Sequence, residues 1–431
     1  MDGLFALGSA LAVVALVFLV WLRDWFFRVC ATGLIGFAYA SGYLQLLMPV
    51  RVVMLILGLA LIIYLLGSKR VTATTREKVL LSGIAALGCV GFVIGQSVIS
   101  GSETDALFRY TLLYPAMLIV GYLISRASKT HLLAHVYVYV SLVMALLAVF
   151  ERLRGTFLVA GTYDNADRLV RDGALRSIVF SEHPLVLSVL IAASGPFIPL
   201  VFRSLGARLA AYSLIIGGIL STNSRGALAI LAAWFLVKAA TKVKFLTPGA
   251  ARVAKVLGFV GAGVAFISIV IGEGIDELSS VSAVDASAEY RVALYSFAVR
   301  SLIEQPWGWG ISGLPEGVYL LPSYFGVLDI SKTVDSELAL AIFDFGWLGL
   351  LGFVGLLFVQ FRTRSLSRPI GQAALIISAS GLYLALHAWV GLGSVWLLLA
   401  GLALGAVSHD APSPESNSRT EASFKKTTAP T

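Results

Sequence analysis

Charged residues are scarce in this sequence of 431 residues. Only 13% of the residues are charged, whereas 58% are hydrophobic, and the mean hydropathy is +0.88. This composition excludes a soluble domain of this length and is typical of a helical membrane protein. The apolar runs are continuous over about 20 residues, so they lack the ten-residue alternation of an outer-membrane barrel.

Cysteine and histidine are also rare. The two cysteines, Cys30 and Cys89, fall inside apolar runs, and the five histidines are scattered. We therefore expect neither a disulfide nor a metal site. The sequence has no Walker motif and no glycine-rich dinucleotide motif, which argues against a nucleotide-driven pump and against a bound cofactor. The net charge of +8 reflects membrane orientation and anionic headgroups, so no nucleic-acid partner is expected.

The apolar runs predict an all-α, polytopic transmembrane bundle of about thirteen spans, within a range of about 12 to 14. The expected limits are 4–22, 26–48, 50–67, 79–99, 109–125, 132–150, 184–202, 209–223, 226–241, 253–272, 337–361, 370–387 and 389–407. The first run lacks the basic flank of a signal peptide, so we expect it to be retained. The membrane domain covers residues 1–407, and the polar segment 408–431 is predicted to be a disordered tail.

Basic residues alternate along the connections between these spans. Lysine and arginine mark five connections, namely 69–78, 126–129, 203–208, 238–255 and 362–368. The positive-inside rule places these connections and the C-terminal tail in the cytoplasm, with the N-terminus on the opposite side. Three segments are then left outside, namely 101–105, 151–183 and 272–336, of which the last is the longest.

Arg225 is the most informative single residue. It lies in Ser221-Thr222-Asn223-Ser224-Arg225-Gly226, between two apolar runs that leave no room for a long loop. An arginine at the edge of a bilayer costs a few kcal/mol unless an anion or water meets it. The topology puts Arg225 at the outer face, which indicates an anionic ligand delivered in the membrane, such as a lipid phosphate.

The outer segment 151–183 mixes aromatic, amide, acidic and basic side chains, which is typical of sites that bind sugars or polar headgroups. Arg176 is a candidate ligand for phosphate, because arginine contacts phosphate through two parallel hydrogen bonds. Glu182 and His183 precede Pro184, which suits the first turn of a helix. They either cap that helix or take part in acid–base chemistry.

The outer segment 272–336 contains an amphipathic helix at 289–303, with Arg291 and Arg300 on its polar sides. Tyr290 near its start, and Trp307 and Trp309 in the following Pro306-Trp307-Gly308-Trp309-Gly310 turn, are candidates for stacking on sugars. Asp335 and Glu337 lie where the chain re-enters the membrane. Either carboxylate could accept a proton from a sugar hydroxyl, and the alternative is that both cap the next helix.

The order of these motifs resembles the O-antigen polymerase and O-antigen ligase superfamily over roughly residues 150–360. The resemblance rests on Ser224-Arg225-Gly226, an arginine-led amphipathic helix, a P-x-G-x-G turn and a polar motif before a glycine-rich span. It implies a GT-C-like glycosyltransferase of the bacterial inner membrane that uses undecaprenyl-diphosphate-linked oligosaccharide on its periplasmic face. By position, Arg225 and Arg291 match the two arginines that engage the lipid diphosphate.

The resemblance leaves the reaction open between two branches. The ligase branch has an essential histidine at the re-entry point, whereas this chain reads Asp335-Ser336-Glu337 there and has no histidine between His183 and His387. This favours a metal-independent polymerase of O-antigen, capsule or exopolysaccharide, with a chain-length regulator as a further partner. The alternatives are a ligase that transfers glycan to lipid A core and a lipid-linked oligosaccharide flippase. A flippase should carry its charges along a central cavity, whereas here they gather at one face.

Overall fold

The computed structural model describes residues 25–44, 49–68, 71–72, 74–75, 108–159, 170–171, 174–240, 283–310, 314–323, 326–332, 334–361 and 369–409. Within these residues the chain is mostly helical, and its strands form two short antiparallel hairpins. The elements in chain order are α2 (Trp25–Tyr39), α3 (Ser41–Leu44), α4 (Val50–Leu66), η1 (Arg109–Leu113), α7 (Tyr114–Arg126), α8 (Thr130–Arg154), β1 (Val170–Arg171), β2 (Ala174–Leu175), α9 (Pro184–Ser194), η3 (Gly195–Phe197), α10 (Ile198–Val201), α11 (Leu205–Ser221), α12 (Arg225–Ala240), α14 (Ala283–Glu304), β3 (Leu320–Ser323), β4 (Gly326–Asp329), η4 (Ile330–Lys332), α15 (Glu337–Phe361), α17 (Pro369–Ser380) and α18 (Val390–His409).

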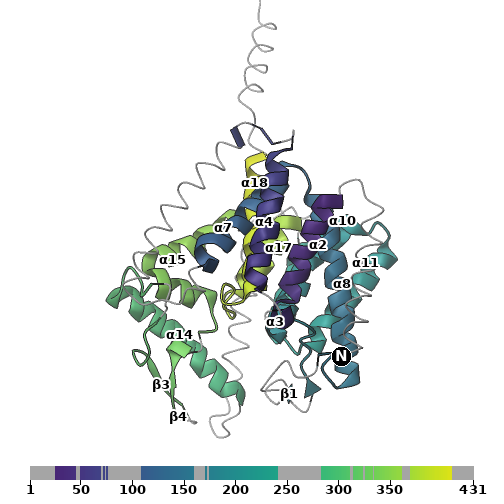
Figure 1. Cartoon of the computed structure of the whole chain (residues 1–431). Coiled ribbons are helices and arrows are strands. Elements are labelled where there is room, and N and C mark those ends of the chain that lie inside the picture. The colour runs from purple at the N-terminus through teal and green to yellow at the C-terminus, as the bar shows by residue number, and fades with distance from the viewer. Residues whose placement is uncertain are drawn as a thin grey trace, which may run out of the picture.

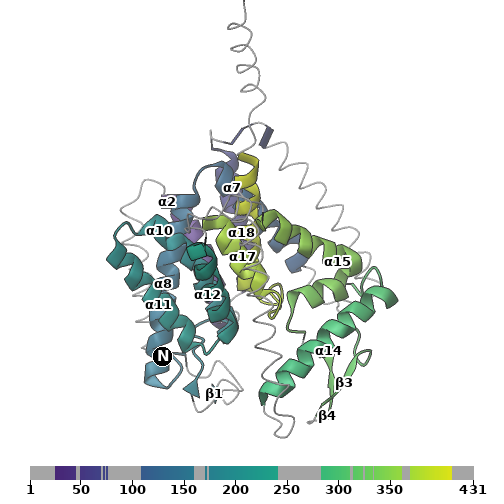
Figure 2. The same cartoon turned by 180° about the vertical axis from the view of Figure 1, so that it is seen from behind.

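Most of the helices lie side by side in one bundle, and α7 packs closely along α18 within it (Figure 1 and Figure 2). Glycines allow this close approach. A Cβ atom at Gly121 would lie 2.0 Å from the carbonyl oxygen of Leu398, and one at Gly401 would lie 2.0 Å from that of Leu118. Small residues at helix crossings are common in membranes, where close backbone packing helps to drive association. The two helices therefore form a tightly packed centre.

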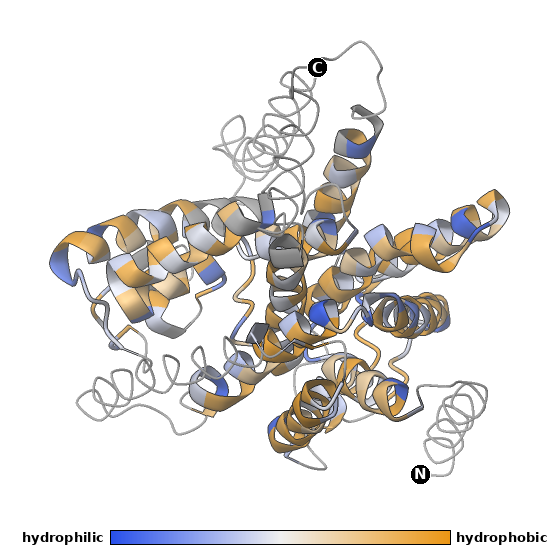
Figure 3. Ribbon diagram, turned by 90° about the horizontal axis from the view of Figure 1, so that it is seen from above, coloured by the Kyte–Doolittle hydropathy of each residue, from blue (hydrophilic) through white to orange (hydrophobic). Residues whose placement is uncertain are grey.

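Hydrophobic residues predominate along the helices of the bundle (Figure 3), and many large apolar side chains are exposed on its outside. Ile63 is 72% exposed, Leu153 is 81% exposed and Phe358 is 69% exposed. Among the residues that the structure describes, three helices are long and apolar enough to cross a bilayer, namely Thr130–Arg154, Pro184–Val201 and Glu337–Phe358, and several shorter helices are also apolar. The prediction of a mostly helical membrane protein is therefore confirmed at this level.

The expected spans 4–22, 79–99 and 253–272 lie outside the described residues. Each of the other expected spans contains a helix. The expected span 26–48 is divided between α2 and α3 at Ala40. The tail predicted from residue 408 also lies outside the described residues beyond His409, where α18 ends.

The predicted limits of the last two spans are wrong where the spans meet. The sequence predicted helix to residue 387 and again from 389, but α17 ends at Ser380 and α18 begins at Val390. Residues 381–389 form a loop of turns and bends, which we call the site loop. Its apolar composition matched that of a span. Non-helical backbone at membrane depth is tolerated where protein groups satisfy its polar atoms, and the contacts described below do this.

The sequence predicts that successive connections between helices alternate between the two ends of the bundle, and the contacts between helix ends agree with this order. The guanidinium of Arg126 donates to the Thr75 hydroxyl at 3.3 Å, so the connections 69–78 and 126–129 share one side of the bundle. At the other end, Arg109 contacts the site loop, and so do His183 just before α9 and the first residues of α12 and α15. We call this end, which carries the site loop, the site face.

Helix α14 and the β3–β4 hairpin pack as a separate layer on α15, at the edge of the bundle (Figure 1), and we call these elements, with the described residues between them, the outer layer. Its core joins Leu294 and Ala298 of α14 to Tyr319, and to Ile342 and Phe343 of α15. The β3–β4 hairpin, with Leu320 paired to Asp329, projects beside α14. The all-α prediction missed this hairpin and the two-residue β1–β2 pair.

Candidate active site

The site loop is held by hydrogen bonds from several distant elements. The Gly381 carbonyl accepts from the Glu337 N–H at 2.7 Å, and the Tyr295 hydroxyl of α14 donates to the Leu382 carbonyl. The Ser336 hydroxyl lies 3.1 Å from the Tyr295 hydroxyl, which joins α14, the start of α15 and the loop. The loop thus has a defined conformation although it is not helical.

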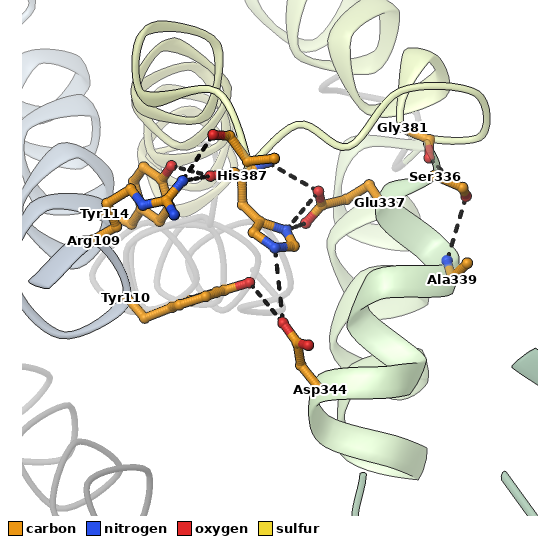
Figure 4. A network of polar contacts seen from close by, with 10 residues as sticks. Arg109, Tyr110, Tyr114, Ser336, Glu337, Ala339, Asp344, Gly381 and His387 are labelled. Carbon is orange, nitrogen blue, oxygen red and sulfur yellow. Dashed lines mark hydrogen bonds and ion pairs between the residues drawn. The ribbon is translucent and has the colours of Figure 1, made fainter. Parts of the chain in front are cut away.

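Two residues at the start of η1 and α7 hold the other end of the site loop (Figure 4). One Arg109 nitrogen, Nη1, donates to the carbonyl oxygens of His387 at 2.9 Å and of Ala388 at 2.8 Å. The Tyr114 hydroxyl also donates to the His387 carbonyl, at 2.5 Å. These bonds fix the backbone of His387 and turn its side chain toward α15.

The imidazole of His387 meets the carboxylate of Glu337 (Figure 4). Its Nδ1 atom lies 2.8 Å from both Oε1 and Oε2, and the His387 backbone N–H donates to Oε2 at 3.0 Å. Both side chains are buried. A buried carboxylate needs such partners, because leaving it unpaired in a low-dielectric interior is costly.

Asp344 lies on the opposite side of the same imidazole. Its Oδ2 atom is 3.8 Å from Nε2 of His387 and accepts a hydrogen bond from the Tyr110 hydroxyl at 3.0 Å. Tyr110 also packs its ring 5.0 Å from the His387 ring. His387 is therefore placed between two carboxylates of α15, in an arrangement that can orient the imidazole and hold a proton on it.

Glu182 and His183 reach the same face from the segment before α9. Burial raises the pKa of Glu182 to about 7, although hydrogen bonds from Ser41 and from the Val390 N–H, and the charges of Arg109 and Arg51, oppose this shift. Burial, together with the charge of Arg176, lowers the pKa of His183 to about 4. A neutral His183 fits its contacts, since its Nδ1 accepts from the Leu185 N–H at 3.2 Å.

His183 therefore caps α9, as one of the two sequence interpretations expected. Its ring also stacks on Trp389, with 5.4 Å between the ring centres. The cap brings the segment 176–183 onto the end of the site loop. Glu182 and His183 remain candidates for acid–base chemistry.

A buried glutamate of α8 orders the segment just before Glu182. Glu151 is fully buried, and its Oε2 accepts from the N–H groups of Ile178 and Val179, each at 2.8 Å. Its Oε1 accepts from the Leu158 N–H at 2.9 Å. Glu151 therefore has a structural role, since its carboxylate is used to satisfy buried backbone donors.

Arg225 is exposed as the first residue of α12. The next residue, Gly226, lies against Tyr383 of the site loop, and a Cβ atom there would be 2.9 Å from the ring. Arg176 donates from Nε to the carbonyl of Thr222 at 3.2 Å, three residues before Arg225. The structure therefore brings the Arg176 segment, the Arg225 turn and the site loop together.

The predicted residues of the outer layer have different surroundings. Arg291 lies in α14, one helical turn before Tyr295, whose hydroxyl reaches Leu382. Tyr290 packs on the core of the outer layer, and Trp309 is half-buried with its Nε1 donating to Ser301 at 3.3 Å. Trp307, at 65% exposure, is the most open of these aromatic side chains. Asp335 is exposed beside the buried Glu337.

Sequence reasoning missed His387, Asp344, Arg109 and Tyr110. His387 was assigned to the end of the expected span 370–387, and Asp344 was assigned to the expected span 337–361. Both carry a signal that could have been used, because an ionisable residue inside an apolar run is costly and is usually functional. Their proximity could not be predicted, because it depends on where α17 ends. Among the residues that the structure describes, no group of histidine, cysteine and acidic side chains has an arrangement suited to a metal ion.

The fold and the site define a helical membrane protein with a buried polar centre at one end of its bundle. Residues 210–354 match the model of a family described as Wzy_C, O-Antigen ligase. This match confirms the resemblance to the O-antigen polymerase and ligase superfamily. It includes Arg225, Arg291, Glu337 and Asp344, whereas His387 lies beyond its end. No curated protein matches the chain.

Proposed function

We propose that the protein transfers an oligosaccharide from undecaprenyl diphosphate to a sugar hydroxyl at the periplasmic face of the bacterial inner membrane. The observation that carries this proposal is the meeting of the Arg225 turn and the Glu337 helix start on one loop. The first element offers a cation at the membrane edge, and the second offers carboxylates and an imidazole. A lipid diphosphate donor and a sugar acceptor require both kinds of group.

The reaction joins the acceptor oxygen to the anomeric carbon of the donor sugar. As that bond forms, the bond between the anomeric carbon and the diphosphate oxygen breaks, and the diphosphate leaves with the electron pair. The acceptor proton passes to a carboxylate or imidazole of the site. The donor is already activated, so the transfer needs neither a nucleotide nor a resident metal.

We assign Arg225, Arg291 and Arg176 to the diphosphate. Guanidinium groups bind phosphate oxygens in pairs and stabilise the charge that develops on the leaving group. The support for this assignment is that the Arg225 turn contacts Tyr383 and α14 contacts the neighbouring Leu382, so both elements flank the same two loop residues. Arg176 contacts the carbonyl of Thr222 on the Arg225 turn.

Glu337 is the favoured base among the four predicted candidates. It is the candidate that contacts His387, and a carboxylate paired with an imidazole can pass on a proton after receiving it. Asp335 is exposed next to it and could orient the acceptor. Trp307, Trp309 and Tyr290 are proposed to contact the sugars, of which Trp307 is the best exposed.

Polymerisation of lipid-linked repeat units into O-antigen, capsule or exopolysaccharide is the preferred reaction, with a chain-length regulator as a partner. Ligation to lipid A core is the second candidate, because one observation favours it. The sequence at the re-entry point lacks a histidine, yet His387 reaches Glu337 there from the site loop. The absence of a local histidine therefore no longer argues against a ligase.

The choice of acceptor distinguishes these reactions. Purified protein in detergent would receive a lipid-linked repeat unit as donor, with either a second repeat unit or lipid A core as acceptor. We expect a ladder of longer glycans on a gel with the repeat unit alone. Transfer only to lipid A core would identify a ligase, and no transfer to either acceptor would contradict the proposed function.

A further inference from the structure

Helix α15 is broken at Gly346, nine residues after Glu337 and two residues after Asp344. Gly346 has φ 58° and ψ −132°, which is outside the helical region. The N–H of Trp347, which in a regular helix would donate to Phe343, donates instead to the carbonyl of Pro306 at 2.9 Å. The break thus frees helix carbonyls close to Asp344.

The turn after α14 supplies donors for those carbonyls. The Trp309 N–H donates to the Phe343 carbonyl at 2.6 Å, and the Gly310 N–H donates to the Asp344 carbonyl at 3.0 Å. Three backbone hydrogen bonds therefore connect residues 306–310 with residues 343–347. Satisfying the polar groups of a broken helix in this way is required where water is excluded.

This contact explains the glycine at Gly308 in the P-x-G-x-G turn and the glycine at Gly346 in α15. Gly308 has φ +79°, and a Cβ atom there would lie 2.4 Å from the Asp344 carbonyl oxygen. Gly346 has φ +58°, and a Cβ atom there would lie 1.9 Å from the Pro306 carbonyl oxygen. A side chain at either position would push the turn and the broken helix apart.

Asp344 is the residue that this contact fixes. Its backbone carbonyl accepts a hydrogen bond from the turn, and its side chain reaches His387 and Tyr110. The carboxylate is buried, and its Oδ1 atom has no hydrogen-bond partner among the residues that the structure describes. A small displacement of the turn would therefore change the distance between Asp344 and the imidazole.

We propose that the turn at residues 305–310 is a brace that holds Asp344 against His387, and that Asp344 and Gly308 are positioning residues for this imidazole. With Glu337 on Nδ1 and Asp344 near Nε2, the brace sets the orientation of the ring. The brace belongs to the outer layer, and α14 of that layer also holds the site loop through Tyr295. The consequence for catalysis rests on the proposed function.

The test compares substitutions at two glycines that share a positive φ, Gly308 and Gly317. Gly317 has φ +78°, and nothing lies within 4 Å of a Cβ atom built there. Gly308→Ala should lower kcat for glycan transfer about 100-fold with KM little changed, because a misplacement of about 1 Å can cost that factor. Gly317→Ala should keep wild-type kcat. Asp344→Asn, which preserves shape, should reproduce the loss if Gly308→Ala does not fold.

A spectroscopic measurement follows the imidazole directly. In protein labelled with 15N-histidine, the signals lost in His387→Gln identify His387. We expect Gly308→Ala and Asp344→Asn to shift these signals and Gly317→Ala to leave them in place. Unchanged His387 signals and unchanged kcat in both Gly308→Ala and Asp344→Asn would overturn the proposal. If the wild-type protein transfers no glycan but the signals still shift, the proposed function fails and the brace stands.

Discussion

The Nδ1 atom of His387 lies 2.8 Å from both carboxylate oxygens of Glu337, across a separation of 50 residues in the sequence. Glu337 begins α15, whereas His387 lies in the site loop, and Arg109 and Tyr114 fix the backbone that carries the histidine. A contact held from both sides in this way is pre-organised, so it needs little rearrangement during a reaction. It also gives the polar centre of the site a defined geometry.

Loss of the imidazole should stop transfer without preventing membrane insertion. We expect His387→Gln to lower kcat about 100-fold or more, because Glu337 loses the group that receives its proton. His135→Gln, near the first turn of α8 at the other end of the bundle, is the matched control and should keep wild-type activity. The measurement is the initial rate of glycan transfer at equal amounts of folded protein. Equal rates in the two variants would remove His387 from the mechanism.

The arginines assigned to the diphosphate should act as a unit. Arg225→Ala and Arg291→Ala should each abolish product, and Arg225→Lys should stay severely impaired because an ammonium cannot replace a bidentate guanidinium. The double variant should be little worse than either single variant. Arg300→Ala is the control, since Arg300 is exposed and pairs with Glu304 at 2.6 Å in the same helix. Full activity of Arg225→Ala would leave Arg225 as a headgroup anchor.

If Glu182 acts as a base, the rate of glycan transfer should depend on pH. Its pKa is raised by burial to about 7, so its carboxylate form increases as the pH rises through 7. The value of kcat/KM should then rise across this interval and level off above it. In Glu182→Gln this rising limb should disappear. A limb that persists unchanged in Glu182→Gln would assign the titration to another group.

The side of the membrane on which the site face lies can be measured in intact spheroplasts. Cys30 and Cys89 would first be replaced by alanine, and single cysteines would be introduced as Val318→Cys in the outer layer and Gly206→Cys at the start of α11. Both positions are exposed, and a Cβ atom at Gly206 meets nothing within 4 Å. A thiol reagent that cannot cross membranes should label the first variant in spheroplasts and not the second. The reverse pattern would exclude a periplasmic site.

Some residues of the site could be predicted from the sequence and others could not. Arg225 and Glu337 were found because each lies where an apolar run meets a polar segment, and such positions are costly for charge. His387 was missed because the residues around it are apolar, so the site loop has the composition of a span. Hydropathy measures the environment of a segment, not its backbone conformation.

The break in α15 could not be predicted for a related reason. Gly346 lies in an apolar run that is compatible with a continuous helix, and glycine is common in membrane helices. Its positive φ is required only because the Pro306 carbonyl approaches it from another part of the chain. The P-x-G-x-G turn was recognised as a pattern, but its partner was not. Long-range contacts of this kind depend on the folded arrangement.

The release of undecaprenyl diphosphate is the measurement that tests the central claim most directly. Purified protein would be mixed with a defined lipid-linked repeat unit in the presence of a strong chelator, and glycan length and lipid product would be followed together. We predict that each added repeat unit releases one lipid diphosphate and that chelation leaves the rate unchanged. Arg225→Ala should release none, and His387→Gln should release it about 100-fold more slowly or not at all. Glycan extension without release of the lipid diphosphate, or extension at the wild-type rate in both variants, would contradict the account.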